Sequence, residues 1–275
     1  MLGWFSQLDR LLRGDVTRPD QLHDGGIKID AAGLAVSIVL LGMLYGLCMG
    51  SYSLLKEVPP ELNDPNMRYK QLLATTLKVP ALFYLTLLVT FPSLYVFNAL
   101  VGSRLTLVNV LLLLLASLAV NLAVLSSLGP IVLFFSLTTK SYAFIQLLNV
   151  VMFTVAGVLG LLFLRQTLHR LTAIDDAVVA SPPTNSESGI EPVTQVEPSA
   201  HSRSPLDMPS GQTLGRPTRV VFGCWMAVFA LVGAQMGWVL RPFIGSPDMK
   251  FEWFRERRSN FFEAVVNALE RLFTG

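Results

Sequence analysis

The sequence predicts an all-α fold: a polytopic membrane helical bundle of about five transmembrane helices, with amphipathic surface helices. Mean hydropathy is +0.53 and only 15% of the residues are charged, whereas soluble domains carry about a quarter. The run Val79–Leu164 contains just two charged residues, Arg104 and Lys140. Since a helix of about 20 apolar residues already crosses a bilayer, this run alone predicts several spans.

Composition also excludes some classes of partner and cofactor. A net charge of +2 is too small to indicate nucleic-acid binding. The three histidines are scattered through tails and loops without metal-ligand spacing. Both cysteines, Cys48 and Cys224, fall inside predicted spans, where reduced apolar packing is expected. The sequence therefore predicts no metal, no cofactor and no nucleic-acid partner, and it makes the lipid bilayer the main surroundings of the chain.

Residues 1–30 form a predicted N-terminal tail that begins with an amphipathic helix. Leu2, Phe5, Leu8 and Leu12 fall on one face of that helix. Such a face suits the membrane interface, but it suits packing against the rest of the protein equally well. Both interpretations stay open at this point.

The membrane domain is predicted over residues 31–164, and its first span is 31–50. This span carries Gly42, Gly46 and Gly50, one small residue on every fourth position. Small-residue faces let helices in lipid approach closely. They indicate either a homo-oligomer seam or packing against another helix of the same chain, and the second is favoured.

The loop after the first span should contain a surface helix. It starts at Asp64-Pro65, where proline occupies the first helical position. Pro80 is expected to end or kink this helix at the membrane surface. Its basic residues should meet lipid headgroups; they are Arg68, Lys70 and Lys78.

Three further spans complete the predicted membrane domain, over residues 79–102, 105–127 and 141–164. The break at Gly129-Pro130 leaves a half-length apolar segment, 131–138. This segment could be an interfacial helix, a re-entrant segment or the far half of one tilted, kinked helix. The kinked helix is favoured, because irregular backbone at membrane depth needs protein cover or a cavity.

The character of the chain changes over residues 175–218, which are rich in Ser, Pro, Thr and Glu. Such a segment buries too little apolar area to offset its conformational entropy, so a disordered linker is predicted. The fifth span follows at 219–240 and contains Gly233 and Gly237, another small-residue pair. Five spans place the two termini on opposite sides of the membrane. The basic residues divide almost evenly, and the N-terminal side is taken as cytoplasmic.

The C-terminal tail, residues 241–275, is predicted to be structured. Asn260 should cap an amphipathic helix, with Glu263 three residues later. Aromatic and basic residues precede that helix and form a hypothetical binding surface for lipid or a protein partner. The residues proposed for this surface are Arg241, Trp253, Arg255 and Arg258.

No charged residue lies deep in any of these spans as drawn, and no nucleophile–base pair or phosphate-binding loop is present. The sequence therefore predicts a membrane scaffold, or a protein that binds a partner or lipid, and not an enzyme. The alternative is a transporter or channel for a neutral or lipidic substrate, based on Pro92 and Gly129-Pro130. It requires a cavity lined by polar groups of the spans, drawn from Asn98, Asn121, Ser126 and Ser127.

Two resemblances add a setting to these predictions. The stretches Lys78-Val-Pro-Ala-Leu-Phe, Phe91-Pro-Ser-Leu-Tyr-Val-Phe-Asn98, Trp238-Val-Leu-Arg-Pro-Phe-Ile-Gly-Ser-Pro247 and Asn260-Phe-Phe-Glu-Ala-Val265 resemble an uncharacterised family of bacterial multi-pass inner-membrane proteins. This resemblance covers roughly residues 66–164 and 219–270 and implies a bacterial inner membrane without any particular activity. The five-span outline is also similar to that of Yip1-type membrane proteins, in topology only.

Overall fold

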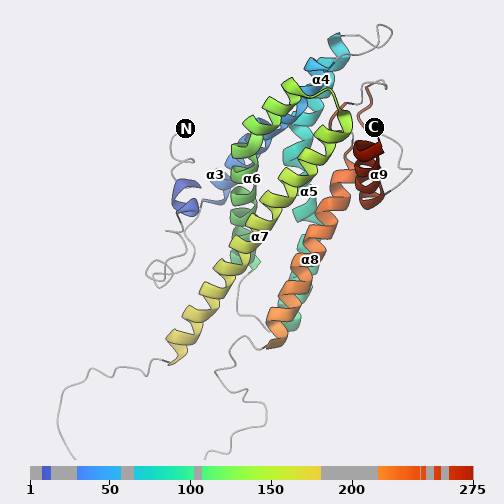
Figure 1. Ribbon diagram of the computed structural model, residues 1–275. Coiled ribbons are helices and arrows are strands. Elements are labelled where there is room, and N and C mark those ends of the chain that lie inside the picture. The colour runs from blue at the N-terminus through green and yellow to red at the C-terminus, as the bar shows by residue number, and fades with distance from the viewer. Residues whose placement is uncertain are drawn as a thin grey trace, which may run out of the picture.

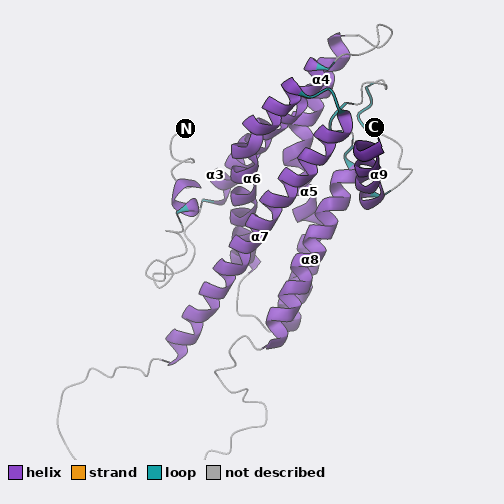
Figure 2. Cartoon of the chain, viewed as in Figure 1, coloured by secondary structure: helices purple, strands orange, loops and turns teal. Residues whose placement is uncertain are grey.

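The computed structural model is all-helical over the part of the chain that it describes, as Figure 2 shows. The described residues are 8–13, 30–56, 65–101, 107–180, 216–241, 243–245, 251–254 and 260–274. The helices, in chain order, are α3 (Ala31–Gly50), α4 (Tyr52–Leu55), α5 (Pro65–Val101), α6 (Leu107–Thr138), α7 (Tyr142–Ala180), α8 (Arg216–Val239) and α9 (Phe261–Thr274).

Within the described residues, four stretches are long and apolar enough to cross a membrane. They are Ala31–Leu55, Pro65–Ser93, Leu111–Thr138 and Tyr142–Thr167. Helix α8 adds a shorter apolar stretch, Gly223–Val239. The predicted fold class, a helical membrane bundle of about five spans, is confirmed.

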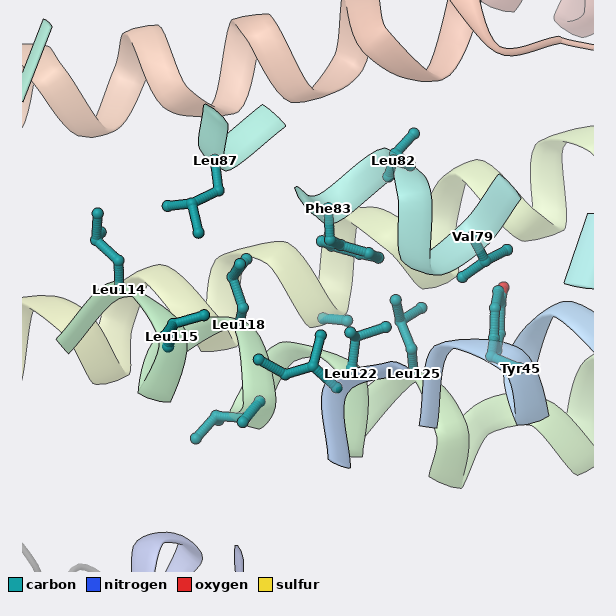
Figure 3. Close-up of a cluster of buried hydrophobic side chains, with 14 of the residues drawn as sticks. Tyr45, Val79, Leu82, Phe83, Leu87, Leu114, Leu115, Leu118, Leu122 and Leu125 are labelled. Carbon is teal, nitrogen blue, oxygen red and sulfur yellow. The ribbon is translucent and has the colours of Figure 1, made fainter. Parts of the chain in front are cut away.

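The long helices run alongside one another (Figure 1). Helix α3 packs against α5 and α6, α6 packs against α7, and α5 packs against α8. Figure 3 shows the core between them, where leucines of α6 such as Leu118 and Leu122 face Phe83 and Leu87 of α5. Tyr45 of α3 belongs to the same cluster and is fully buried. The apolar positions on these helices thus divide between an internal core and a surface that faces lipid.

Helix α5 corrects the predicted bounds of the second span. The expected surface helix and the expected span 79–102 are one continuous helix, with Pro80 and Pro92 inside it. At Pro80 the neighbouring α3 offers Gly42, and a Cβ built on this glycine would lie 3.1 Å from the Cβ of Pro80. Helix packing at a glycine therefore accommodates the proline ring, so that the helix continues instead of ending.

Helix α6 decides between the three interpretations of segment 131–138. It runs without interruption from Leu107 to Thr138, with Pro130 inside it, so the single-helix interpretation is the one the structure supports. Gly129 faces α3 closely: a Cβ built on it would lie 3.1 Å from the Cys48 Sγ. Gly129 is therefore buried against α3 while Pro130 is exposed, and the helix passes through both residues without a re-entrant turn.

Both small-residue faces pack against α5 of the same chain. A Cβ built on Gly46 would lie 2.8 Å from the Thr76 Cα, so α3 and α5 approach to backbone contact. On α8, a Cβ on Gly237 would lie 3.4 Å from the Leu82 Cδ1. The favoured interpretation of these faces is therefore confirmed. A homo-oligomer remains a prediction, and it would have to use a different surface.

The ends of the bundle differ from their predicted bounds. Helix α7 extends to Ala180, so the first residues assigned to the linker 175–218 are helical. The helix ends just before Ser181-Pro182-Pro183, where proline cannot continue it. Helix α8 begins at Arg216, and residues 181–215 lie outside the described residues.

The described part of the N-terminal tail is a short helix over residues 8–12. Leu8 and Leu11 are buried and belong to the main core cluster, while Leu12 is exposed. Of the two open interpretations, packing against the protein is the one that the structure supports for these residues.

Candidate functional site: docking of the C-terminal tail

The chain after α8 turns back onto the bundle and is held there by its own backbone carbonyls. Gln71 Nε2 donates a hydrogen bond to the Phe243 carbonyl at 3.0 Å, and the Thr75 hydroxyl donates to the same oxygen. Gln71 and Thr75 lie one helical turn apart on α5, and both are buried. A buried carbonyl needs such donors, because an unsatisfied polar group in an apolar setting is costly. The first turn of the tail is therefore fixed to α5.

Two other elements hold the next residues of the tail. Lys56, which follows α4, donates from Nζ to the Gly245 carbonyl at 2.5 Å. Tyr142, the first residue of α7, donates from its hydroxyl to the Ile244 carbonyl at 3.4 Å. Ile244 and Gly245 are both buried. This part of the tail thus links α4, α5 and α7 at one end of the bundle.

Lys78 is the most unusual residue of the site. It lies near the middle of the apolar stretch Pro65–Ser93, and it is only 4% exposed. Its ammonium donates to the Trp253 carbonyl and lies 5.1 Å from the ring centroid of Phe254. A cation–π contact of this kind contributes about 2 kcal/mol when it is desolvated. The tail therefore supplies both a hydrogen-bond acceptor and an aromatic face to a buried cation.

The position of Lys78 corrects two expectations drawn from the sequence. It does not meet lipid headgroups, and a charged residue does lie deep in an apolar segment. A second span that begins at Val79 leaves Lys78 just outside it. Since α5 is continuous through Pro80, Lys78 falls inside it, and the tail provides the protein cover that an intramembrane charge requires.

Gln71, Thr75 and Lys78 form one stripe along α5, which we call the docking row. Their spacing of four and then three residues places them on a single helix face. The stripe continues toward α8 with Thr86 and Ser93, and Trp225 Nε1 of α8 donates to the Ser93 Oγ at 3.2 Å. This polar periodicity within an apolar helix was the sequence pattern that could have revealed the site.

Comparison with known proteins gives no family and no relative for this chain, since no family model, curated protein or solved structure matches it. The properties of the site therefore follow from its own geometry.

The structure describes two of the four residues predicted for the tail surface. The Arg241 guanidinium lies over the ring of Trp238, with Cζ 3.8 Å from the ring centroid. Trp253 contributes its carbonyl to Lys78, and its ring makes an edge contact with Phe251. Arg255 and Arg258 lie outside the described residues. The predicted surface is thus divided between an arginine stacked on α8 and an aromatic segment on the docking row.

The outer side of the docked segment remains open. Trp253 is 47% exposed and Phe254 is 61% exposed, although both residues belong to a segment that is hydrogen-bonded to the core. Large rings held in fixed positions and left exposed are typical of binding surfaces. The backbone of this segment is therefore held by the bundle while its aromatic side chains remain accessible to another molecule.

The described residues include no group of three His, Cys, Asp or Glu side chains that could hold a metal ion. The transporter alternative requires polar side chains that line one cavity, but the described side chains among them do not all lie on the inside of the bundle. Asn121 and Ser126 are buried, whereas Ser127 is exposed and donates to the Val124 carbonyl of its own helix at 2.7 Å. The side chain of Asn98 lies outside the described residues. Among these residues, the tail-docking site is the better-defined arrangement.

Proposed function

We propose that this protein is a non-enzymatic membrane scaffold whose C-terminal tail binds a protein partner or lipid. One observation carries the proposal: the tail is fixed to the docking row through backbone carbonyls, while the rings of Trp253 and Phe254 remain exposed. Anchoring through the backbone leaves side chains free to contact another molecule. It also lowers the entropy lost on binding, because the surface is already ordered.

The setting of the proposed scaffold is a cell membrane, and a bacterial inner membrane is the setting implied by the sequence resemblance. The bundle itself supports the membrane part of this proposal. The alternative, a transporter or channel for a neutral or lipidic substrate, has less support. It depends on the Gly129-Pro130 region, where α6 packs closely on Cys48 of α3.

The test compares what co-purifies with the full-length chain and with two altered chains. One lacks residues 241–275. The other carries Trp253→Ala, which removes an exposed ring and keeps the carbonyl that accepts from Lys78. Both altered chains should lose the same bound protein or lipid from membranes solubilised under mild conditions. Leu231→Ala, at an exposed leucine on α8, is the control and should retain it.

An unchanged set of bound molecules in both altered chains would overturn the proposal. Loss in the truncated chain alone would place the binding surface elsewhere in the tail, away from Trp253. Retention by Trp253→Ala therefore contradicts the exposed aromatic segment as the contact, whatever the truncated chain shows.

A further inference from the structure

Helix α9 has its faces divided into three sectors. At about 100° per residue, Phe261, Val265 and Ala268 fall together on one side. Ala268 is only 4% exposed, and α9 packs against α7 and α8. The buried Ala268 shows that this sector faces the bundle. Figure 1 shows α9 beside the end of α8.

A second sector is apolar and yet exposed. It consists of Phe262, Val266, Leu269 and Phe273, which repeat at intervals of four, three and four residues. Their exposed fractions are 51%, 53%, 46% and 80%. Four large apolar side chains in one continuous stripe on a 14-residue helix form a patch that soluble surfaces rarely present.

The third sector is polar and also exposed. It contains Glu263, Asn267, Glu270 and Arg271. On the helical wheel the centre of this sector lies about 115° from the centre of the apolar exposed stripe and about 140° from the centre of the bundle-facing side. A helix that meets three different surroundings on three sides is expected where protein, hydrocarbon and water come together.

We infer that the exposed stripe of α9, Phe262, Val266, Leu269 and Phe273, is seated in the acyl-chain region of the bilayer. These side chains contact the acyl chains of lipids, and the polar sector faces headgroups and water. Lipid is the expected contact because the stripe lies next to other exposed apolar surface of the bundle. Helix α9 packs on α7 and α8, and these helices expose apolar residues of their own, such as Val151 and Leu231.

Local structure fixes where α9 begins. The Asn260 side chain caps the helix, since the Glu263 backbone N–H donates to Asn260 Oδ1 at 2.9 Å. The hydrogen bond from Lys78 to the Trp253 carbonyl holds the chain a few residues earlier. This inference rests on the proposed function, in which the tail contacts membrane or a partner. It adds that α9 makes its contact with lipid acyl chains.

The experiment places single spin labels on the full-length chain in liposomes of zwitterionic and anionic phospholipid. Cys48 and Cys224 are first replaced by alanine, and a cysteine is then introduced at one position of α9 at a time. The lipid-facing set is Phe262, Val266, Leu269 and Phe273, and the matched control set on the same helix is Glu263, Asn267 and Glu270. Collision rates with oxygen, which concentrates in hydrocarbon, and with a water-soluble nickel chelate are measured at each position.

The expected result is a reversal within one helix: oxygen collisions dominate at the lipid-facing set and nickel collisions dominate at the control set. Nickel dominance at all seven positions would overturn the inference, because the stripe would then face water. Low rates for both reagents with spin–spin broadening would instead assign the stripe to a second copy of this chain. Low rates without broadening would assign it to protein cover, and both outcomes also contradict acyl-chain contact.

A second measurement uses the unaltered chain, so that the inference does not depend on the labelled variants folding. Phospholipids with a photoreactive group near the acyl-chain end are mixed into the same liposomes and activated by light. Adducts should map to Phe262, Val266, Leu269 or Phe273, and their absence from α9 beside adducts on α7 would contradict the inference. If Trp253→Ala releases a bound protein while α9 faces water, the scaffold proposal stands and only the lipid inference fails.

Discussion

At the scale of single residues, Lys78 is the clearest case of a side chain whose surroundings cannot be predicted from its neighbours in the sequence. A buried ammonium in an apolar segment is costly unless protein groups cover it and pair with it. Here it lies between an acceptor and a ring that are distant in the sequence, the Trp253 carbonyl and Phe254. The charge is therefore tolerated because the tail covers it, and in return it fixes the tail.

Lys78→Met should loosen the tail without unfolding the bundle. Methionine is unbranched and apolar, so it suits the buried position, but it cannot donate to the Trp253 carbonyl. A hydrogen bond from a charged group contributes about 1.5–3 kcal/mol, which corresponds to roughly 10- to 100-fold in an opening equilibrium. Amide hydrogen exchange at residues 251–254 and in α9 should accelerate by that factor.

Lys70→Met is the control for that measurement, because Lys70 lies exposed on the same helix. Exchange in α9 should not change in this variant. Equal exchange rates in Lys78→Met and in the unaltered chain would show that the ammonium contributes nothing to tail docking.

At the scale of the elements, close approach of helices depends on where glycines face a partner. Gly46 faces the α5 backbone, with Thr76 Cα 2.8 Å from a built Cβ, whereas Gly157 on α7 has no atom within 4 Å. The two glycines look alike in the sequence, and both lie inside apolar helices. Only the first is required by packing, because there the contact is with backbone, which cannot move aside.

Gly46→Ala should therefore lower the thermal stability of the protein in detergent, and Gly157→Ala should not. Overpacking of this kind costs about 1–3 kcal/mol. The measurement is the midpoint of thermal unfolding of both purified variants beside the unaltered chain. Equal midpoints for the two variants would mean that α3 and α5 do not touch at Gly46.

At the scale of the whole molecule, the number of spans decides where the ends of the chain lie. Four long apolar stretches and the shorter one in α8 give about five crossings, while α9 packs beside the bundle. The predicted odd number of crossings puts the N-terminal tail and the linker between α7 and α8 on one side of the membrane and the C-terminus on the other.

Reporter fusions at Ser186 and at the C-terminus of the full chain should therefore give opposite results in a bacterial host. The Ser186 fusion should report a cytoplasmic position, and the C-terminal fusion should report a periplasmic one. Signals from the same side would contradict five spans. Opposite signals with a periplasmic Ser186 would keep the span count and reverse the proposed sidedness.

Much of the fold could be predicted because its signals are local. Apolar runs of span length, the Asn260 cap of α9 and the glycine spacing of α3 are all properties of neighbouring residues. At Gly129-Pro130 the favoured single helix is the one that the structure shows. At Pro80 the expected surface helix and the expected second span are one continuous helix, which packs on Gly42 of α3.

The sequence by itself determined that this chain is a helical membrane bundle, because hydropathy and helix length are sums over adjacent residues. Tertiary structure alone decided which helices share a seam, and that the tail returns to the docking row. Lys78 and Trp253 are 175 positions apart, and no local pattern predicts that pairing. The reason is physical: burying a charge and satisfying a carbonyl are requirements of a shared environment, which exists only once the helices have packed.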